Sequence, residues 1–105
     1  MSLVTTHVLD TAAGRPAAGI AVRFETAEGE LIAEGRTDAD GRIRDLGPET
    51  LAPGSYRLVF DTGAYLGPAA FFPEVALTFR ISDPAAHHHV PLLLSPFAYS
   101  TYRGS

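Results

Sequence analysis

The sequence predicts an all-β fold, a two-sheet antiparallel β-sandwich of seven or eight short strands with one short helix. Eight prolines and ten glycines divide the 105-residue chain into runs that are too short for ordinary helices. Those runs are rich in Val, Ile, Leu, Phe, Tyr and Thr, and several alternate apolar with polar residues. The length suits one hydrophobic core, so we expect a single domain over residues 1–105.

The strands predicted in the first half of the chain are residues 3–10, 20–26, 31–37 and 42–46. Alternation in the second of these strands places three apolar side chains on its buried face: Ile20, Val22 and Phe24. Arg23 and Glu25 point the other way, so we expect both of them to face water. The segment 38–41, Asp-Ala-Asp-Gly, is typical of a tight turn before the short strand that follows.

The strands predicted in the second half are residues 55–61, 75–82, 88–94 and 99–105. The only plausible helix lies within residues 62–73, where Gly63, Gly67 and Pro68 limit it to one or two turns. Pro91 interrupts the strand at residues 88–94 and lacks the N–H that a sheet ladder needs. We therefore expect that strand to lie at a sheet edge or to contain a bulge.

Composition excludes several classes of function. The net charge of −4 comes from 12 acidic residues and 8 basic residues, all of the latter arginine, so nucleic acid is not an expected partner. The chain has no cysteine, which removes disulfides, thiolate metal sites and a cysteine nucleophile. The first residues lack the basic and long apolar runs of a signal peptide, and no apolar run is long enough to span a membrane. We expect a cytoplasmic protein.

His7 is unusual in the first predicted strand, because an apolar or β-branched residue would pack better on the face that it shares with Leu3, Thr5 and Leu9. One interpretation is a residue of a functional site. The other is a core or interface histidine whose ring is satisfied by a backbone carbonyl. For a single histidine in a strand, the sequence favours the second interpretation and leaves the first open.

A run of three histidines opens the strand at residues 88–94. In an extended segment His87 and His89 share one face, whereas His88 points with Val90, Leu92 and Leu94. Two imidazoles on one face could bind zinc or copper with a third ligand from elsewhere. No carboxylate or thiol adjoins them to complete a metal site, so a polar loop leading into a strand is the simpler interpretation. We expect neither a metal nor another cofactor.

The C-terminal segment, residues 95–105, stays aromatic and β-prone to its last few residues, whereas chain ends are usually polar and frayed. We therefore expect it to be docked, which would fix Tyr102, Arg103, Ser105 and the terminal carboxylate.

Residues 38–41 do not form a calcium loop, because Arg36 and Gly47 fall where such a loop needs carboxylates. Phosphate-binding glycine loops and nucleophile elbows are absent from the sequence as well.

Four motifs carry a resemblance to a known family: Thr-His-Val-Leu-Asp at residues 6–10, Gly-Arg-Thr-Asp-Ala-Asp-Gly-Arg at 35–42, Phe-Phe-Pro-Glu-Val at 71–75, and the whole segment 87–105. That last segment ends in Tyr-Arg-Gly-Ser, which marks the hydrolases of the family and is missing from its hormone carriers. On these motifs the sequence resembles the 5-hydroxyisourate hydrolases, the transthyretin-like enzymes of urate degradation. The resemblance covers essentially the whole chain.

The resemblance implies a transthyretin/prealbumin-like sandwich that assembles as a homotetramer, a dimer of dimers with its sites at the dimer–dimer interface. It also implies hydrolysis of 5-hydroxyisourate, a purine-derived small molecule, to 2-oxo-4-hydroxy-4-carboxy-5-ureidoimidazoline. The catalytic residues carried over from the family are His7, Arg42, His89 and Ser105. The substrate-binding residues carried over are Arg42, Tyr102 and Arg103.

Water attack on a ring amide needs a base, a stabiliser for the oxyanion and a proton for the leaving nitrogen. His7 or His89 can act as the base, and the sequence does not decide between them. Arg42 suits the oxyanion, although Arg44 lies only two residues further on. Ser105 would orient water or substrate through its hydroxyl or its carboxylate. Two alternatives remain, a transthyretin-type carrier of an aromatic molecule and a structural or adhesion sandwich.

Overall fold

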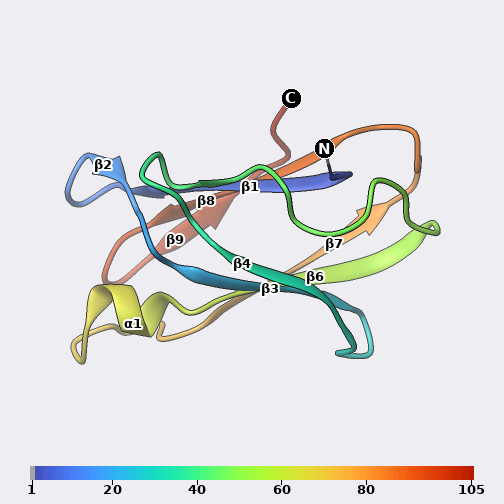
Figure 1. Ribbon diagram of the computed structural model, residues 1–105. Helices are drawn as coiled ribbons and strands as arrows, with labels where there is room; N and C mark the ends of the chain where they lie inside the picture. The colour runs from blue at the N-terminus through green and yellow to red at the C-terminus, as the bar shows by residue number, and fades with distance from the viewer. Residues whose placement is uncertain (1) are drawn as a thin grey trace.

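The computed structural model describes residues 2–105, and Met1 of the predicted domain lies outside the described residues. Two β-sheets pack face to face around an apolar core (Figure 1). The predicted all-β sandwich with one short helix is confirmed. The described chain has nine strands rather than seven or eight, because Arg15 and Pro16, which lie outside the predicted strands, form the two-residue strand β2 (Arg15–Pro16).

The five-stranded sheet contains both ends of the described chain. Its order is β2, β1 (Val4–Asp10), β8 (His88–Leu94) and β9 (Tyr99–Thr101), with β5 (Arg42–Ile43) also paired to β1. Strands β1 and β8 are parallel, and they are the exception to the antiparallel pairing among residues 2–105. A parallel pair needs a long crossover connection, and here the other sheet lies within that connection.

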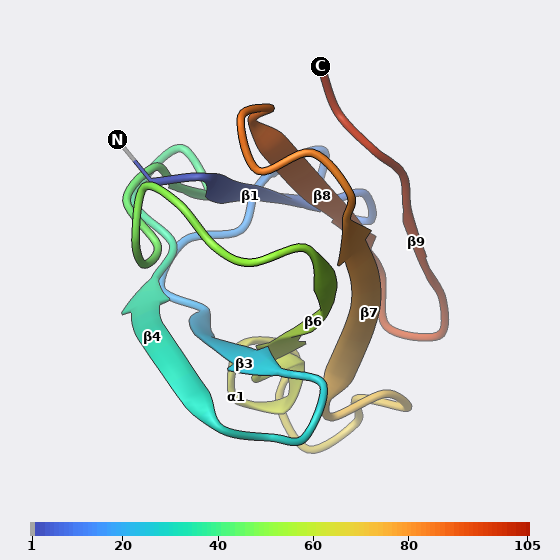
Figure 2. The same ribbon diagram turned by 90° about the vertical axis from the view of Figure 1, so that its right-hand side faces the viewer.

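The four-stranded sheet has the order β4 (Leu31–Arg36), β3 (Ala21–Thr26), β6 (Gly54–Phe60) and β7 (Val75–Ile81). Helix α1 (Thr62–Leu66) follows β6 at one end of the sandwich, within the predicted segment 62–73 (Figure 2). The Asp61 carboxylate accepts a hydrogen bond from the Ala64 N–H and caps the first turn of the helix. Within residues 2–105 no helix has the length and hydropathy needed to cross a bilayer.

Alternating apolar side chains from both sheets fill the space between them. The predicted inward face of β3 is confirmed, because Ile20, Val22 and Phe24 are all buried. Val90, Leu92 and Leu94 of β8 pack into the same core from the other sheet. Burial of apolar surface at roughly 25 cal/mol per Å² makes this layer the main source of stability. The outward side chains of both sheets are therefore free to serve other purposes.

Strand β8 is central in its sheet and its pairings keep one register past Pro91, so the prediction of a sheet edge or a bulge at this strand is wrong. The pairing with β9 covers residues 92–94 and resumes only at the bridge between His89 and Gly104. Pro91 lies in that interruption, so its missing N–H removes no ladder bond. The Thr101 hydroxyl donates to the Pro91 carbonyl oxygen at 2.6 Å.

The prediction that Glu25 faces water is also wrong. Glu25 lies on the outer face of β3, as its alternation requires, but its side chain is buried. The Nε atoms of Arg23 and Arg57 lie 3.0 and 3.2 Å from its two carboxylate oxygens. Arg57 comes from the neighbouring strand β6, where it pairs directly with Glu25, so the contact depends on strand register rather than on local sequence.

Candidate active site

A hollow of about 220 Å³ opens on the outer face of the five-stranded sheet, over β1, β5 and β8. The residues that line it are Thr5, Thr6, Arg42, Ile43, Arg44, His87, His89 and Ser105. Three of the predicted catalytic residues, Arg42, His89 and Ser105, are therefore brought together although they are far apart in sequence. Within residues 2–105, no group of three histidine, aspartate or glutamate side chains is arranged to hold a metal ion.

His87, which precedes β8, and His89 within it lie side by side on this face, as their alternation predicted. Their ring centroids are 6.3 Å apart and their planes differ by 27°. The parallel register of β1 and β8 places Thr5 directly opposite His89. As a result the Thr5 hydroxyl oxygen lies 2.8 Å from Nδ1 of His89 and 2.9 Å from Nε2 of His87.

Gly104 of the C-terminal segment packs directly on the His89 ring. Its backbone N–H donates to the His89 carbonyl oxygen at 2.8 Å. A Cβ atom built on Gly104 would overlap Cδ2 of His89, so only glycine fits at this point of the segment. The predicted docking of the C-terminal segment is confirmed for Gly104, and the contact limits the orientations open to His89.

The turn at residues 38–41 positions Arg42 beside β1. The Asp38 carboxylate accepts hydrogen bonds from the backbone N–H groups of Asp40 and Arg42, at 2.8 and 3.0 Å. Gly41 adopts φ 76°, and a Cβ atom there would overlap the Val8 carbonyl oxygen. Because the turn can approach β1 so closely, Arg42 pairs with His7 in the sheet.

The two candidate arginines differ in their partners. Nη1 of Arg44 lies 3.1 Å from the Asp38 carboxylate, so this guanidinium is already ion-paired. In the described part of the chain no carboxylate forms such a pair with Arg42. Arg42 is therefore the guanidinium that lines the hollow without a carboxylate partner among the described residues.

His7 is adjacent to the hollow but does not line it. Its Nε2 atom lies 2.9 Å from the Asp40 carbonyl oxygen, and since a carbonyl only accepts, Nε2 carries the proton and donates. The ring is satisfied by a backbone carbonyl, one of the two arrangements that the sequence left open. Its second nitrogen, Nδ1, is the atom left for any chemistry.

The electrostatic environment favours the neutral form of His89. Burial lowers the pKa of His89 below its ordinary value of 6.5, and the positive charge of Arg42 lowers it further. His87 and His7 contribute to this lowering of the pKa in the same direction. At neutral pH the ring is therefore uncharged, and one of its nitrogens can accept a proton.

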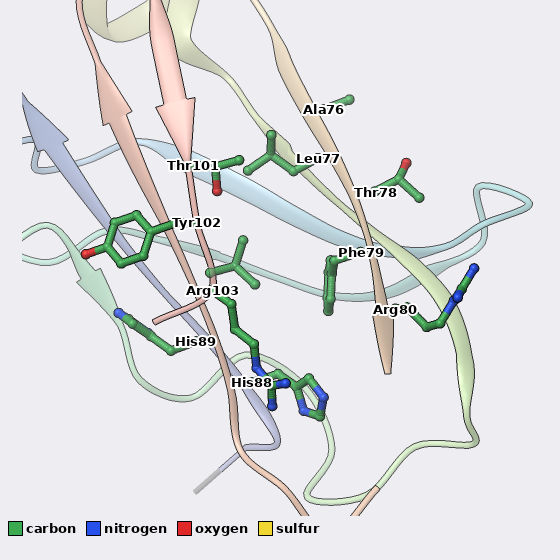
Figure 3. A pocket seen from close by; sticks show the side chains of 11 residues that line it. Ala76, Leu77, Thr78, Phe79, Arg80, His88, His89, Thr101, Tyr102 and Arg103 are labelled. Atoms are coloured by element: carbon green, nitrogen blue, oxygen red, sulfur yellow. The ribbon is translucent and has the colours of Figure 1, made fainter. Parts of the chain in front are cut away.

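The predicted substrate-binding residues Tyr102 and Arg103 line a second hollow, of about 380 Å³, between β7 and the C-terminal segment, and His89 lines both hollows. Figure 3 shows the Arg103 side chain running toward His88, while the Tyr102 ring projects away from β7. His88 is only 5% exposed, and its Nδ1 atom has no hydrogen-bond partner within residues 2–105. The inward direction predicted for His88 is confirmed.

Sequence reasoning did not single out Thr5 as a functional residue. Alternation places Thr5 and His7 on the same face of β1, but that pattern alone says nothing about a partner. The signal appears only once β1 and β8 are known to be parallel and in register, because this pairing puts Thr5 against His89.

Comparisons with known proteins agree on one family. The profile of the HIUase/Transthyretin family matches residues 4–104. The chain is 48% identical to the 5-hydroxyisourate hydrolase of Caulobacter vibrioides, with the whole of both chains covered. Its fold is similar to the structure of Klebsiella pneumoniae 5-hydroxyisourate hydrolase, with a TM-score of 0.88, 39% identity, and 97% of this chain and 98% of that chain covered. It is also similar to sea bream transthyretin in complex with thyroxine, with a TM-score of 0.85, 36% identity, and 96% and 93% covered.

Proposed function

The chain belongs to the HIUase/transthyretin family, and from this membership and its site we infer that it is a hydrolase of urate degradation. It opens the ring of 5-hydroxyisourate to give 2-oxo-4-hydroxy-4-carboxy-5-ureidoimidazoline. The observation that carries this function is the convergence of His89, Arg42 and Ser105 on one hollow. A carrier of an aromatic ligand needs only a suitably shaped channel, so the neutral imidazole beside a free guanidinium favours the enzyme over the carrier.

His89 is the proposed general base. It lines the hollow together with Arg42, and its lowered pKa keeps it neutral at the pH of the cell. Since Nδ1 is held by the Thr5 hydroxyl, Nε2 is the nitrogen that takes a proton from water. The same nitrogen then returns that proton to the departing ring nitrogen, so the ring is neutral again after one turnover.

Arg42 is the proposed stabiliser of the negative charge that develops on the attacked carbonyl oxygen. A guanidinium stays charged at any working pH and offers several donors in one plane, which suits the flat, oxygen-rich ring of the substrate. A well-placed donor of this kind contributes about 10²- to 10³-fold to turnover. The Asp38 turn holds the backbone of Arg42 in place while leaving the guanidinium free.

His7 and Ser105 have supporting roles in this proposal. With Nε2 bound to the Asp40 carbonyl, His7 can meet the substrate only through Nδ1, so we assign it to substrate orientation beside Arg42. Ser105 lines the hollow, and we assign its hydroxyl to positioning the attacking water or the substrate. Neither role requires a covalent intermediate.

The hollow in one chain is small for a complete site. Its volume of about 220 Å³ lies below the roughly 300 to 1,000 Å³ typical of ligand pockets. We propose that the single domain assembles as a homotetramer, a dimer of dimers, in which a facing sheet closes the hollow. Tyr102 and Arg103 line the other hollow, which His89 also lines, so we assign them to substrate binding beside His89. Light scattering at micromolar concentration tests the tetramer, and a monomer that is fully active would overturn it.

Activity is tested directly by producing 5-hydroxyisourate from urate with urate oxidase and following its ultraviolet decay. Addition of the protein should accelerate the decay, and the His89→Asn variant should not. Decay that stays at the spontaneous rate with the folded wild-type protein would contradict the proposed function.

A cytoplasmic location remains a prediction, and fractionation of cells that express the protein would check it.

A further inference from the structure

The Thr5 hydroxyl has an unusual position, since it lies between two imidazole nitrogens at hydrogen-bond distance. The two distances are 2.9 Å to Nε2 of His87 and 2.8 Å to Nδ1 of His89. Thr5 is only 6% exposed, so water does not compete freely for its hydroxyl. A structural threonine on a sheet would need neither partner.

One hydroxyl carries one hydrogen, so Thr5 can donate to only one of its two neighbours at a time. If it donates to His87, then Nδ1 of His89 must carry a proton and donate to Thr5, and Nε2 of His89 has a free lone pair. If it donates to His89 instead, then Nε2 of His87 carries the proton, and His89 holds its own proton on Nε2. The tautomers of the two rings are therefore linked through Thr5.

We propose that Thr5 and His87 form a proton relay that sets the tautomer of His89 and shares the proton which His89 takes from water. This inference rests on the proposed function of His89 as general base. Thr5 and His87 are positioning residues in it, because they act through His89 rather than on the substrate.

The proton steps of the relay balance. A water O–H bond breaks as its oxygen bonds to the ring carbonyl carbon, and the proton goes to Nε2 of His89. The Nδ1 proton of His89 passes to the Thr5 oxygen, whose own proton passes to Nε2 of His87. His87 then carries the positive charge and His89 is neutral. When the C–N bond breaks, the Nε2 proton of His89 goes to the leaving nitrogen, and the two other protons return along the same path.

The charges around the hollow favour transfer of the proton from His89 to His87. His89 is half-buried and faces Arg42 from β5, His7 from β1 and His87 from its own strand. Arg44 and Ser105 also line the hollow, and none of its described lining residues has an acidic side chain. His87 is exposed directly before β8, so water can solvate its imidazolium far better than that of His89.

The first experiment removes the hydroxyl and keeps the shape of the side chain, by Thr5→Val. We expect kcat to fall about 10- to 100-fold, a part of the roughly 10²- to 10⁴-fold contribution of general-base catalysis, with little change in KM. Thr5→Ser should restore most of kcat because it keeps the hydroxyl. Thr11→Val is the control, since the Thr11 hydroxyl donates to the Leu94 carbonyl oxygen of the same sheet, at the end of β8 away from the histidines.

The second experiment tests the relay with a variant that leaves Thr5 in place, so it stays informative if Thr5→Val does not fold. His87→Phe keeps a ring against His89 and removes both nitrogens, and since His87 is exposed the fold should be unaffected. Its loss of kcat should match that of Thr5→Val, and the double variant should lose no more than either one. Wild-type kcat in His87→Phe, or additive losses in the double variant, would overturn the relay.

Nitrogen NMR of His89 separates the relay from the proposed function. In the wild type we expect the proton on Nδ1, and in Thr5→Val a shift toward the Nε2 tautomer. An unchanged tautomer in Thr5→Val would overturn the relay even if the protein is fully active. Absence of wild-type activity together with the expected tautomer change would refute the proposed function and leave the coupling of His89 to Thr5 intact.

Discussion

The outer faces of the two sheets carry charge in opposite ways. On the four-stranded sheet, Glu25 lies between Arg23 and Arg57, and its carboxylate is bonded to both. On the five-stranded sheet, Arg42 lies beside two histidines in a hollow whose described lining has no acidic side chain. Two arginines are paired with a carboxylate at Glu25, whereas Arg42 has no carboxylate partner among the described residues.

This difference indicates which face is built for stability and which for chemistry. Hydrogen bonding from Arg23 lowers the pKa of Glu25, with a further lowering from Arg57, so the folded state favours the ionised form. The stability from this group is present above its unfolded pKa, near the ordinary 4.5, and is lost as pH falls through the lower folded pKa. The face that carries Arg42 can offer its donors to the oxygens of a substrate instead.

Among the variants that test this difference between the two faces, the largest loss of activity is expected at His89. His89→Asn removes the proposed base and should lower kcat/KM by about 10²- to 10⁴-fold, the usual contribution of a general base. The melting temperature should hardly change, since His89 is on the outer face and only half-buried. A variant that unfolds while its folded fraction keeps full activity would make His89 a structural residue. Decay of 5-hydroxyisourate and thermal melting measure the two quantities.

The next largest effect is expected at the C-terminal segment. In Gly104→Ala the added Cβ must displace either the segment or the His89 ring, so we expect at least a roughly tenfold loss of activity. Deletion of residues 103–105 should act in the same direction and impair catalysis more than folding. Ser100→Ala, on exposed β9, is the control and should behave as wild type. Full activity in Gly104→Ala would show that the contact with His89 is incidental.

A smaller effect concerns pH. Because burial and Arg42 lower the pKa of His89, the acid limb of kcat/KM should have its midpoint below the ordinary 6.5. Arg42→Gln removes the positive charge with the largest effect on His89 and should raise the pKa of His89, as measured by NMR titration of the ring. The titration remains measurable even though this variant loses most of its turnover. A midpoint that stays the same would mean that Arg42 does not act on His89.

The smallest effect is expected on the face that carries Glu25. Glu25→Gln should lower the melting temperature by a few degrees at neutral pH and leave turnover unchanged. The difference from wild type should shrink as pH falls below the ordinary pKa of a glutamate, because the wild-type carboxylate is then protonated as well. Melting curves across pH check this, and a loss of activity without loss of stability would break the distinction between the two faces.

Local pattern was sufficient to predict most of the strands and the direction of most side chains. The period of two separated His87 and His89 from His88 and placed Val22 and Phe24 in the core, because alternation needs no knowledge of neighbours. The helix within residues 62–73 followed from its flanking glycines and proline. The pairing of residues 15–16 as a strand was missed because it depends on the edge of β1.

The parts that could not be predicted depend on pairing between distant strands. Thr5 meets His89 only because β1 and β8 are parallel and in one particular register, and a shift of one residue would break the contact. Glu25 is buried by an arginine from another strand, and Pro91 is tolerated because β9 breaks its ladder at that point. The catalytic roles of His7, Arg42, His89 and Ser105, and the substrate contacts of Tyr102 and Arg103, came from the family resemblance and stay predictions.

The parallel pairing of β1 with β8 also has a consequence for the order of folding. Two pairs of the four-stranded sheet, β3–β4 and β6–β7, join strands that follow one another along the chain, whereas β1 must wait for a strand that begins at His88. Closing so long a loop costs conformational entropy before the contacts between β1 and β8 can offset it. The hairpins should therefore form first. The hollow over β1 and β8 would then be assembled last, and a partly folded chain with native-like hairpins would still lack activity.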